Sequence, residues 1–469
     1  MKVNIFSRPD DMLLAHKIAY EVFLLGGTAY YVGGCVRDSY MDMKNKDIDI
    51  EIYGIDVNQL RCILDKFGER LEHGKSFGVF GIKGYDLDIS LPRKERCTGT
   101  KHTDFDVTVD PTMTTTEGAK RRDLTMNALM YDILNDKLVD PFNGKRDIDL
   151  GIIRHVDAET FVEDPLRVLR VAQFAARFPF MTVAPETIEL CSRIDISTLS
   201  KERIYTELEK ALMKSEKPSI FFNTLRQMKQ LSTWFPEVAD MINVPQSFKY
   251  HKEGDVYTHT MLVLDALAAS YRDTAENPMG LMLSGLFHDL GKIRATTNNN
   301  GEIHSYKHEI FGVEIAFNAI HRITEENNLI NYVLNMVQNH MKPHQLYNTK
   351  SRIKKTNKMF DESVSPFDLV SLAYCDTISA KKDNSEEIAY ACNERDFLCD
   401  RYHAYKECMS LPYVMGRDLV ECGFTPGPYF SEVLTFAHKL RLAGVNKNSA
   451  LTQAIHLAKK LCKESKTIS

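Results

Sequence analysis

The periodicity of the apolar residues changes at about Phe161, and this change limits what the chain can fold into. Before it, runs such as TAYYVGG, KDIDIEIYG, FGVFGIKGYDLDISL and LVDPFNG read as short strands that end at Gly, Pro or Asn. After it, runs such as FVEDPLRVLRVAQFAARF, ERIYTELEKALMK and LINYVLNMVQNH have helical spacing. The sequence therefore predicts an α+β fold, with a small mixed-sheet head followed by helices to the end of the chain.

The 469 residues are long enough for several domains, and the same change in period places their boundaries. We expect a head over 1–150, an all-α neck over 151–245, a helical domain over 246–400 and a helical tail over 401–469. No run of 18 apolar residues and no signal-peptide pattern is present, so we expect no membrane partner. The ten cysteines include no C-x-x-C pair, which is typical of reduced thiols in a cytoplasmic protein. The sequence leaves a monomer and a homodimer equally open.

Positive charge is concentrated in two stretches, although the net charge of the chain is −5. Residues 341–360 contain six Lys or Arg and no acid, and residues 438–469 contain seven Lys or Arg and one acid. Such stretches on an acidic protein indicate local contact with a polyanion. A solvated helical face is the alternative for either stretch alone.

The run KDIDIEIYG alternates three carboxylates with three isoleucines. In a strand, Asp47, Asp49 and Glu51 would share one face at intervals of about 7 Å. Like charges at that distance repel unless a cation lies between them, and Mg²⁺ prefers carboxylate and phosphate oxygens. We therefore expect Asp47 and Asp49 to hold Mg²⁺, where two ions would stabilise an attacking 3′-hydroxyl and a departing pyrophosphate. The alternating run YDLDIS offers Asp86 or Asp88 as a third carboxylate, and we choose Asp88.

Two further motifs of the head contain residues suited to a nucleotide. Gly33 and Gly34 in GGCVRD stand between a predicted strand and a predicted helix, where backbone N–H groups can approach phosphate closely. A plain tight turn explains such a pair as well when it is considered alone. In RRDLTMNAL, Arg122 could bind the triphosphate or the ribose, and Asp123 and Asn127 would come together on a helix.

These motifs stand in a familiar order. GGCVRD, KDIDIEIYG, RRDLTMNAL, DPFNG, EDPLRVLR and ERIYTELEKAL resemble the motifs of the bacterial-type (class II) tRNA nucleotidyltransferases, the CCA-adding enzymes, and of the related bacterial poly(A) polymerases. The resemblance runs over roughly residues 27–215. It implies a nucleotidyltransferase that adds CCA to the 3′ end of tRNA from CTP and ATP with Mg²⁺, and with Asp47, Asp49 and Asp88 as its catalytic carboxylates. It also implies nucleotide contacts from Arg37 and Arg170.

The motif EDPLR contains a pair suited to reading a base. Pro165 at a first helical position would make Asp164 an N-cap, and Arg167, three residues on, would share its face. A carboxylate beside a guanidinium complements the amino group and ring nitrogen of cytosine and adenine, and it repels the carbonyl of guanine or uracil. The resemblance implies that Asp164 and Arg167 act as a protein template. Gln173 departs from the family pattern, which often has Arg there, and this puts one expected phosphate contact in doubt.

The helical domain contains an ordered set of histidines and aspartates that begins in VYTHTMLVLDAL and LFHDLGK. Its members are His259, His288, Asp289, His308, His340 and Asp376. Imidazole mixed with carboxylate suits divalent metals, although a core histidine beside an N-cap explains a lone His-Asp pair. The set resembles the HD-superfamily phosphohydrolases and is large enough for two metals. This implies Ni²⁺, Mn²⁺, Co²⁺ or a similar ion that activates water against a phosphoester, as in a phosphatase or 2′,3′-cyclic phosphodiesterase. We interpret four further histidines as surface residues: His251, His304, His321 and His344.

The tail run GRDLVECGFTPGPYFSEVL resembles the tail of HD-containing CCA-adding enzymes and predicts contact with the acceptor arm of tRNA.

Several functions remain open. A poly(A) polymerase would use the same head with ATP alone, and a CC-adding or A-adding enzyme would differ at no residue that we can name. From another class, a phosphohydrolase could use the head only to sense nucleotide, or the chain could be a non-catalytic RNA-binding scaffold. The presence of Asp47 and Asp49 and of two ligand sets argues against both.

Overall fold

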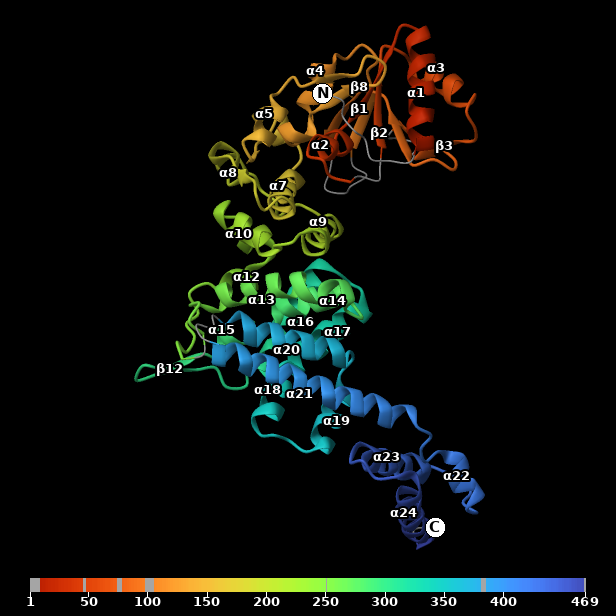
Figure 1. Cartoon of the computed structure of the whole chain (residues 1–469), viewed down its shortest axis with the longest axis vertical. Coiled ribbons are helices and arrows are strands. Elements are labelled where there is room, and N and C mark those ends of the chain that lie inside the picture. Colours follow the sequence, from red (N-terminus) through yellow and green to blue (C-terminus); the bar gives the residue numbers. More distant parts are fainter. Residues whose placement is uncertain are drawn as a thin grey trace. The chain divides into compact units, whose positions relative to one another are not determined.

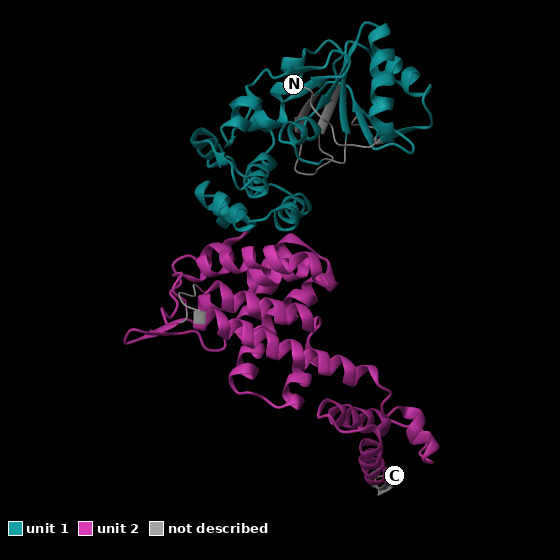
Figure 2. Ribbon diagram, viewed as in Figure 1, with its two compact units in different colours: residues 1–234 teal, residues 235–469 magenta. Residues whose placement is uncertain are grey.

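The computed structural model describes residues 9–44, 48–73, 78–97, 105–249, 251–380 and 385–467. The chain forms two compact units, Met1–Trp234 and Phe235–Ser469 (Figure 1, Figure 2). The first unit contains a mixed sheet with helices, and the described part of the second is helical apart from one small hairpin. The α+β prediction is therefore confirmed. The finer division into head, neck, helical domain and tail remains a prediction.

The sheet of the first unit has the strand order β3-β4-β5-β2-β1-β8-β9 among the described residues. Strands β2 and β5 pair in parallel and the other neighbours pair antiparallel, so the sheet is mixed. Its strands are β1 Thr28–Val32, β2 Ile48–Tyr53, β3 Arg70–His73, β4 Val79–Ile82, β5 Leu87–Ser90, β8 Met130–Asp132 and β9 Lys137–Val139. A separate antiparallel ribbon pairs β6, Arg93–Cys97, with β7, Phe105–Val109.

Strand β2 presents two chemically different faces, as its alternating sequence predicts. Its three isoleucines are fully buried in a core shared with apolar residues of α1 (Pro9–Leu24) and α3 (Val57–Leu64). Both helices cover the same side of the sheet (Figure 1). Asp49 and Glu51 point to the opposite face and are only half-buried. The side of the sheet without these helices is therefore available for a polar site.

The other elements of the first unit are mostly short helices. They are α2 Gly34–Tyr40, α4 Thr115–Lys120, the 3₁₀ helix η1 Thr125–Asn127, α5 Gly144–Asp149, α6 Ala158–Phe161, α7 Leu166–Arg177, α8 Pro185–Cys191, α9 Lys201–Lys214, α10 Ser219–Gln227 and α11 Leu231–Trp234, with the strand pair β10 Ile152–Ile153 and β11 Thr182–Val183. The α-helix expected to bring Asp123 and Asn127 together is absent. Leu124 between them is extended (φ −124°, ψ 145°), and only η1 follows. The prediction of a helix was wrong here because a buried, non-helical turn holds this segment.

The second unit is built from helices of very different length. They are α12 Pro236–Asp240, α13 Val256–Ser270, the 3₁₀ helix η2 Arg272–Thr274, α14 Pro278–Phe287, α15 Lys292–Ala295, α16 His308–Ile323, α17 Asn327–Asn339, α18 Met341–Asn348, α19 Ile353–Glu362, α20 Pro366–Ser379, α21 Ser385–Ser410, α22 Gly416–Glu421, α23 Tyr429–Leu442 and α24 Lys447–Thr467. One hairpin pairs β12, Thr297–Asn299, with β13, Glu302–His304. Helices α22, α23 and α24 share a small apolar core of their own. None of the helices that the structure describes could span a membrane by length and hydropathy.

Candidate nucleotide and metal sites

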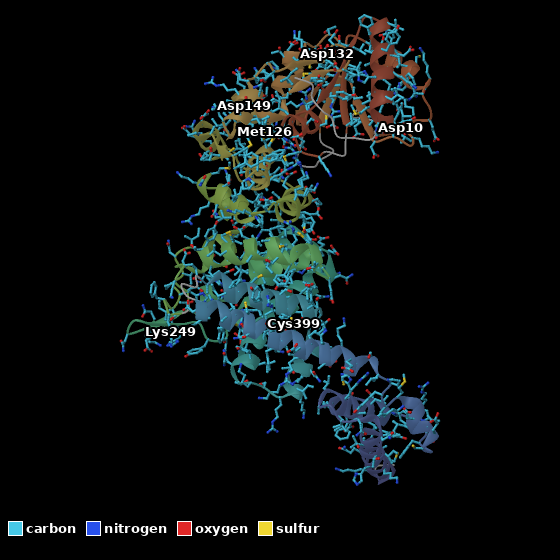
Figure 3. All side chains as sticks on the ribbon, in the orientation of Figure 1. Asp10, Met126, Asp132, Asp149, Lys249 and Cys399 are labelled. Atoms are coloured by element: carbon cyan, nitrogen blue, oxygen red, sulfur yellow. The ribbon has the colours of Figure 1, made fainter. Side chains whose placement is uncertain are left out.

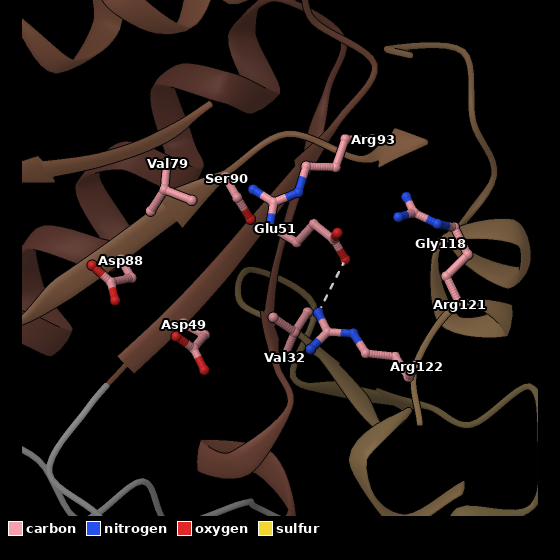
Figure 4. Close-up of a pocket in the computed structure, with 10 residues that line it drawn as sticks. All are labelled: Val32, Asp49, Glu51, Val79, Asp88, Ser90, Arg93, Gly118, Arg121 and Arg122. Carbon is pink, nitrogen blue, oxygen red and sulfur yellow. Dashed lines mark ion pairs between the residues drawn. The ribbon is translucent and has the colours of Figure 1, made fainter. Parts of the chain in front are cut away.

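A cavity of about 320 Å³ opens on the acidic face of β2 (Figure 4). Asp49 and Asp88 both line it and stand in register on the parallel strands β2 and β5. Neighbouring strands lie about 4.8 Å apart, so this register places the two carboxylates side by side. Asp86 is not among the residues that line the cavity, and the structure thus supports the choice of Asp88. Asp47 lies outside the described residues.

Arg122 stands in the same cavity and changes the role expected of the third acid on β2. Its Nη2 atom lies 3.5 Å from Glu51 Oε2, and the Tyr53 hydroxyl donates a hydrogen bond of 2.9 Å to the same oxygen. Burial would lower the pKa of Arg122, but Glu51 and then Asp49 outweigh it and raise this pKa, so the guanidinium stays charged. The cation beside Glu51 is therefore an arginine of the protein, whereas Asp49 stands in register with Asp88 in the same cavity.

A second cavity, of about 570 Å³, shares Asp49 and Arg122 with the first. The predicted nucleotide-binding residues all line it: Gly33, Gly34, Arg37, Arg122, Asp123, Asn127, Asp164, Arg167 and Arg170. Gly33 has φ 69°, and a Cβ atom on it would lie 3.0 Å from Nη1 of Arg122. A side chain at this position would therefore be strained and would crowd the arginine. The glycine turn therefore forms part of the wall of this cavity.

A network of buried ion pairs joins the glycine-rich segment to α7. Asn127 donates a hydrogen bond of 2.9 Å to one oxygen of Asp123, and Arg170 donates one of 2.7 Å to the other. Burial alone would raise the pKa of Asp123, but the charge of Arg170 and the hydrogen bond from Asn127 hold it below its usual value. Arg37 donates to Asn127 (2.5 Å) and to Asp38 (2.8 Å) and is 3% exposed. Arg37 thus orders the wall of the cavity and has little surface left for a nucleotide.

The proposed template residues lie in the same cavity but do not pair with each other. Arg203 Nη2 donates to both oxygens of Asp164, each at 2.9 Å. Arg167 donates to the carbonyl oxygens of Thr160 (2.5 Å) and Arg121 (2.8 Å). Asp164 also accepts the backbone N–H two residues on (3.1 Å), so the expected capping contact is present, although the helix itself is capped one residue later. Arg203 was not predicted as a site residue, although it stands in the motif ERIYTELEKAL.

The second unit brings the predicted metal ligands into one buried cluster. In His288, His308 and His340, the Nδ1 atom lies 2.9, 2.9 and 2.7 Å from the carbonyl oxygen three residues earlier. A carbonyl can only accept, so each Nδ1 carries a proton, and in a neutral ring Nε2 then presents a lone pair. The Nε2 atoms of His308 and His340 face each other at 3.0 Å, and they lie 3.3 and 3.9 Å from Asp289 Oδ1. Two nitrogen atoms at this distance must share a proton or a metal ion.

The other half of the cluster surrounds His259 and Asp376. His259 Nε2 lies 2.8 Å from Asp376 Oδ1 and 3.9 Å from Asp289 Oδ2. His288 Nε2 is 3.3 Å from Asp289 Oδ2 and has no hydrogen-bond partner among the described residues. Asp289 is therefore shared by two groups of candidate ligands, His259–His288–Asp289 and Asp289–His308–His340. This sharing fits the expectation of two metals.

Two histidines interpreted as surface residues belong to the same cluster, so that interpretation was wrong for them. His344 Nε2 lies 3.2 Å from Asp376 Oδ2, and its Nδ1 lies 2.9 Å from Glu394 Oε1. Its spacing of four from His340 could have indicated this. His251 Nδ1 lies 2.9 Å from Glu253 Oε1. That same Glu253 oxygen is 2.7 Å from Nδ1 of His259, as expected of an outer carboxylate that orients a ligand.

The cluster is reached through a cavity of about 820 Å³. Asp289, Lys292 and His308 line it together with Ile303 and the surface residue Lys249 (Figure 3). Lys292 Nζ lies 2.7 Å from Asp289 Oδ2 and donates a hydrogen bond of 2.8 Å to the Gln246 side chain. Burial would raise the pKa of Asp289, but Lys292 and then His288 hold it well below its usual range. The cavity therefore connects solvent with an ionised carboxylate at the centre of the cluster.

Three protein-family models match the chain. The Poly A polymerase head domain matches residues 29–154, the probable RNA and SrmB-binding site of polymerase A matches 181–242, and the HD domain matches 256–380. The first covers the predicted head motifs, and the last covers the six predicted metal ligands from His259 to Asp376. The matches follow one another along the chain in the order expected from the resemblance.

Curated relatives match most of the chain. The multifunctional CCA protein of Haemophilus ducreyi is 35% identical over 300 residues, which are 63% of this chain and 70% of that protein. The one from Shewanella frigidimarina is 35% identical over 339 residues, 71% of this chain and 78% of that protein. The chain belongs to the multifunctional CCA protein family. The family member from Pasteurella multocida is 38% identical over 290 residues, 61% of this chain and 67% of that protein.

Solved structures share the fold of this multifunctional CCA protein family member. An apo CCA-adding enzyme superposes with a TM-score of 0.64, 20% identity and coverage of 96% of both chains. The Thermotoga maritima CCA-adding enzyme complexed with tRNA gives a TM-score of 0.62 at 19% identity, again over 96% of both chains. At these identities the likeness shows the fold, and the α+β architecture extends over nearly the whole chain.

Both domain types found in this member of the multifunctional CCA family depend on metals, and the described residues contain groups that fit them. In the head, Asp49 and Asp88 offer the hard oxygen ligands that Mg²⁺ prefers. In the HD domain, burial and the neighbouring His308 and His288 hold the pKa of His340 well below its usual value, so its imidazole is neutral as a ligand must be. The facing Nε2 atoms of His308 and His340, 3.0 Å apart, are placed to share a proton or a metal ion.

Proposed function

We propose that this protein adds C, C and A to the 3′ end of tRNA from CTP and ATP, and that the head cavity is the site of this reaction. The observation that supports it most directly is the gathering of Asp49 and all the predicted nucleotide-binding residues around one cavity. Relatives named multifunctional CCA protein, and neighbouring structures described with CTP, ATP or tRNA, point to the same substrates. A cytoplasmic location is proposed with this role.

In this proposal, the 3′-hydroxyl oxygen of tRNA attacks the α-phosphorus of the nucleotide, and pyrophosphate leaves. Asp49 and Asp88, with Asp47 from outside the described residues, would hold Mg²⁺, which supplies Lewis-acid stabilisation of the attacking and leaving oxygens. Arg122 remains charged beside Asp49 and can bind the triphosphate. The glycine turn lets backbone N–H groups approach the same phosphates without interference from a side chain.

Base selection is proposed for Asp164 and Arg167. A carboxylate can accept about four hydrogen bonds and a guanidinium can donate five, so each group keeps capacity beyond the contacts seen here. Arg203, bound to both oxygens of Asp164, would set the direction in which that carboxylate faces the base. Because Arg203 and Arg167 make separate contacts, the two halves of the template are held independently.

Asp164→Ala and Arg167→Ala should increase misincorporation of U and G more than they weaken triphosphate binding. A hydrogen bond to a charged group is worth about 1.5–3 kcal/mol, which is roughly ten- to hundredfold in discrimination. The measurement is the ratio of kcat/KM for correct and incorrect nucleotides. Lys214→Ala serves as the matched control, because Lys214 lines the same cavity without a base-reading role and should affect all nucleotides alike. If the template variants also lower affinity for every nucleotide equally and leave misincorporation unchanged, the template assignment is wrong.

We further propose that the HD domain is a phosphohydrolase acting on phosphate monoesters or 2′,3′-cyclic phosphates. A divalent transition metal such as Ni²⁺, Mn²⁺ or Co²⁺, held by the imidazole and carboxylate groups around Asp289, would activate water there. Lys292, buried beside Asp289, is placed to balance the negative charge of a phosphate. Such hydrolysis suits repair, because a 3′ end blocked by phosphate cannot accept a nucleotide.

The domain boundaries at 150, 245 and 400 and the tRNA contact of the tail are part of the same proposal. Helices α22, α23 and α24 have their own apolar core, which supports a separate tail from Gly416 onward, whereas α21 continues through the proposed boundary at 400. The basic residues of 438–469 then offer a positively charged surface for the acceptor arm.

Addition to a tRNA that ends at the discriminator base tests the main proposal. Labelled CTP, ATP, GTP and UTP are offered singly and then together. We expect two C residues from CTP alone, followed by one A when ATP is present. Addition of many A residues to unrelated RNA would instead identify a poly(A) polymerase, and addition of C without A, or of A only to tRNA ending in CC, would identify a partial enzyme.

A further inference from the structure

The cavity beside the HD-domain cluster has an apolar and aromatic wall, which binding of a phosphate group alone would not require. Most of the cluster side of the cavity is buried and charged, and Asp289 is 1% exposed. The same cavity is lined by Tyr306, which is 74% exposed, and by Tyr390 and Met341. A metal-bound phosphate needs the first set of groups only. The apolar and aromatic wall therefore indicates that the ligand has a flat, uncharged part as well.

Tyr306 is backed by a second ring. The rings of His304 and Tyr306 are stacked, with centroids 5.0 Å apart and planes inclined by 12°. One face of the Tyr306 ring thus rests on His304, while most of the side chain remains exposed. Exposed aromatic rings of this kind are the platforms on which proteins stack the bases of single-stranded nucleic acids.

The stacked pair is joined directly to the metal-ligand cluster. His304 is the last residue of strand β13. Ser305, which separates His304 from Tyr306 in the sequence, shares a hydrogen bond of 2.8 Å with the hydroxyl of Thr296. The carbonyl oxygen of Ser305 also accepts the Nδ1–H of the candidate ligand His308 (2.9 Å). The backbone that positions the rings therefore also positions one ligand, which fixes the stacked pair beside the cluster.

We propose that His304 and Tyr306 form a base-stacking subsite, so that the HD domain selects phosphate esters that carry a nucleoside over those that do not. This rests on the proposed hydrolase function. In the reaction, a water oxygen bonds to phosphorus, one P–O bond of the cyclic phosphate breaks, and the freed ribose oxygen takes up the proton that water gives. The base on Tyr306 contributes binding and selectivity and takes no part in this exchange. A cavity of about 820 Å³ is large enough for one nucleotide.

Two cyclic phosphates test the subsite. Adenosine 2′,3′-cyclic phosphate and glycerol 1,2-cyclic phosphate share the strained ring, and only the first has a base. With Ni²⁺ or Mn²⁺, Tyr306→Ala should raise KM for the adenosine substrate roughly five- to hundredfold, while kcat/KM for the glycerol substrate stays within about twofold. Tyr306→Phe should retain wild-type KM, because the ring and not the hydroxyl makes the contact.

Phe317→Ala is the matched control. Phe317 and His321 form another exposed aromatic–histidine pair, with centroids 4.2 Å apart, and they do not line the cavity. This variant should behave as the wild type with both substrates. Equal loss of both activities in Tyr306→Ala, or loss of bound metal by elemental analysis, would overturn the subsite and leave Tyr306 a support for His308. Failure of the wild type to hydrolyse either substrate would instead refute the hydrolase function, and the subsite with it.

Discussion

Asp49→Ala should lower the rate of nucleotide addition by about 10²–10⁴-fold and leave the protein folded, since removal of a catalytic group typically costs that much. The side chain is half-buried on the face of β2 opposite the isoleucine core, so its loss leaves that core intact. It also removes one negative charge from beside Asp88, which does not destabilise the strand pair. Single-turnover addition of C to tRNA measures the effect, and thermal unfolding checks the fold.

The control for this variant is Asp86→Ala. Asp86 lies two residues before Asp88 and has the same charge, but it does not line the cavity beside β2. We expect it to keep wild-type addition, whereas Asp88→Ala should fall with Asp49→Ala. The same argument applies to Asp47→Ala from the alternating sequence, although that residue lies outside the described part of the chain. If Asp49→Ala retained more than about a tenth of the wild-type rate, its role as a metal ligand would be refuted.

The local patterns of the sequence were enough to predict much of the head site. The alternation of acids and isoleucines in β2 correctly predicted which side chains are buried, because successive side chains of a strand point to opposite faces. The predicted nucleotide-binding residues line one cavity. This was predictable because their motifs were recognised together as a family pattern, since no single spacing shows that the residues meet. The element type around Asp123 was predicted wrongly, yet the contact with Asn127 is present, since a tight turn can join these residues as a helix would.

What the sequence could not show are the partners that come from distant segments. Arg203 binds Asp164 across 39 residues, and Arg122, in the segment between α4 and η1, lies 3.5 Å from Glu51 on β2, so neither pair has a local pattern. His344 was interpreted as a surface residue, and the sequence signal against this, its spacing of four from His340, does not identify Asp376 as its partner. Its contact with Asp376 depends on how α18 packs against α20, which tertiary structure alone determines. The type and order of the candidate metal ligands were thus predictable from the sequence. The residues that contact these ligands from other segments were not.

The other large effect is expected in the second unit, where Asp289→Asn should abolish hydrolysis and spare addition. Asp289 is shared by both groups of candidate ligands, so losing its charge weakens both metal positions together. Asparagine keeps the volume of the side chain and an oxygen for Lys292, which makes unfolding a smaller risk than with alanine. Hydrolysis of a 2′,3′-cyclic phosphate should fall about 10²–10⁴-fold, and elemental analysis should show less bound transition metal. The double variant His288→Ala with Asp289→Ala should show the same loss.

Addition of CCA should remain within about threefold in Asp289→Asn, because the two ligand sets lie in different compact units and have no residue in common, and sites without shared partners act nearly independently. Asp49→Ala should show the reverse, with hydrolysis retained and addition lost. Asp368→Asn is the control, since Asp368 is buried on the same helix as Asp376 but accepts the Tyr332 hydroxyl (2.5 Å) outside the cluster. It should unfold at a lower temperature and still hydrolyse. Full hydrolysis by Asp289→Asn with its metal retained would show that the cluster is not the hydrolytic centre, and a parallel loss of addition would show that the two sites depend on each other.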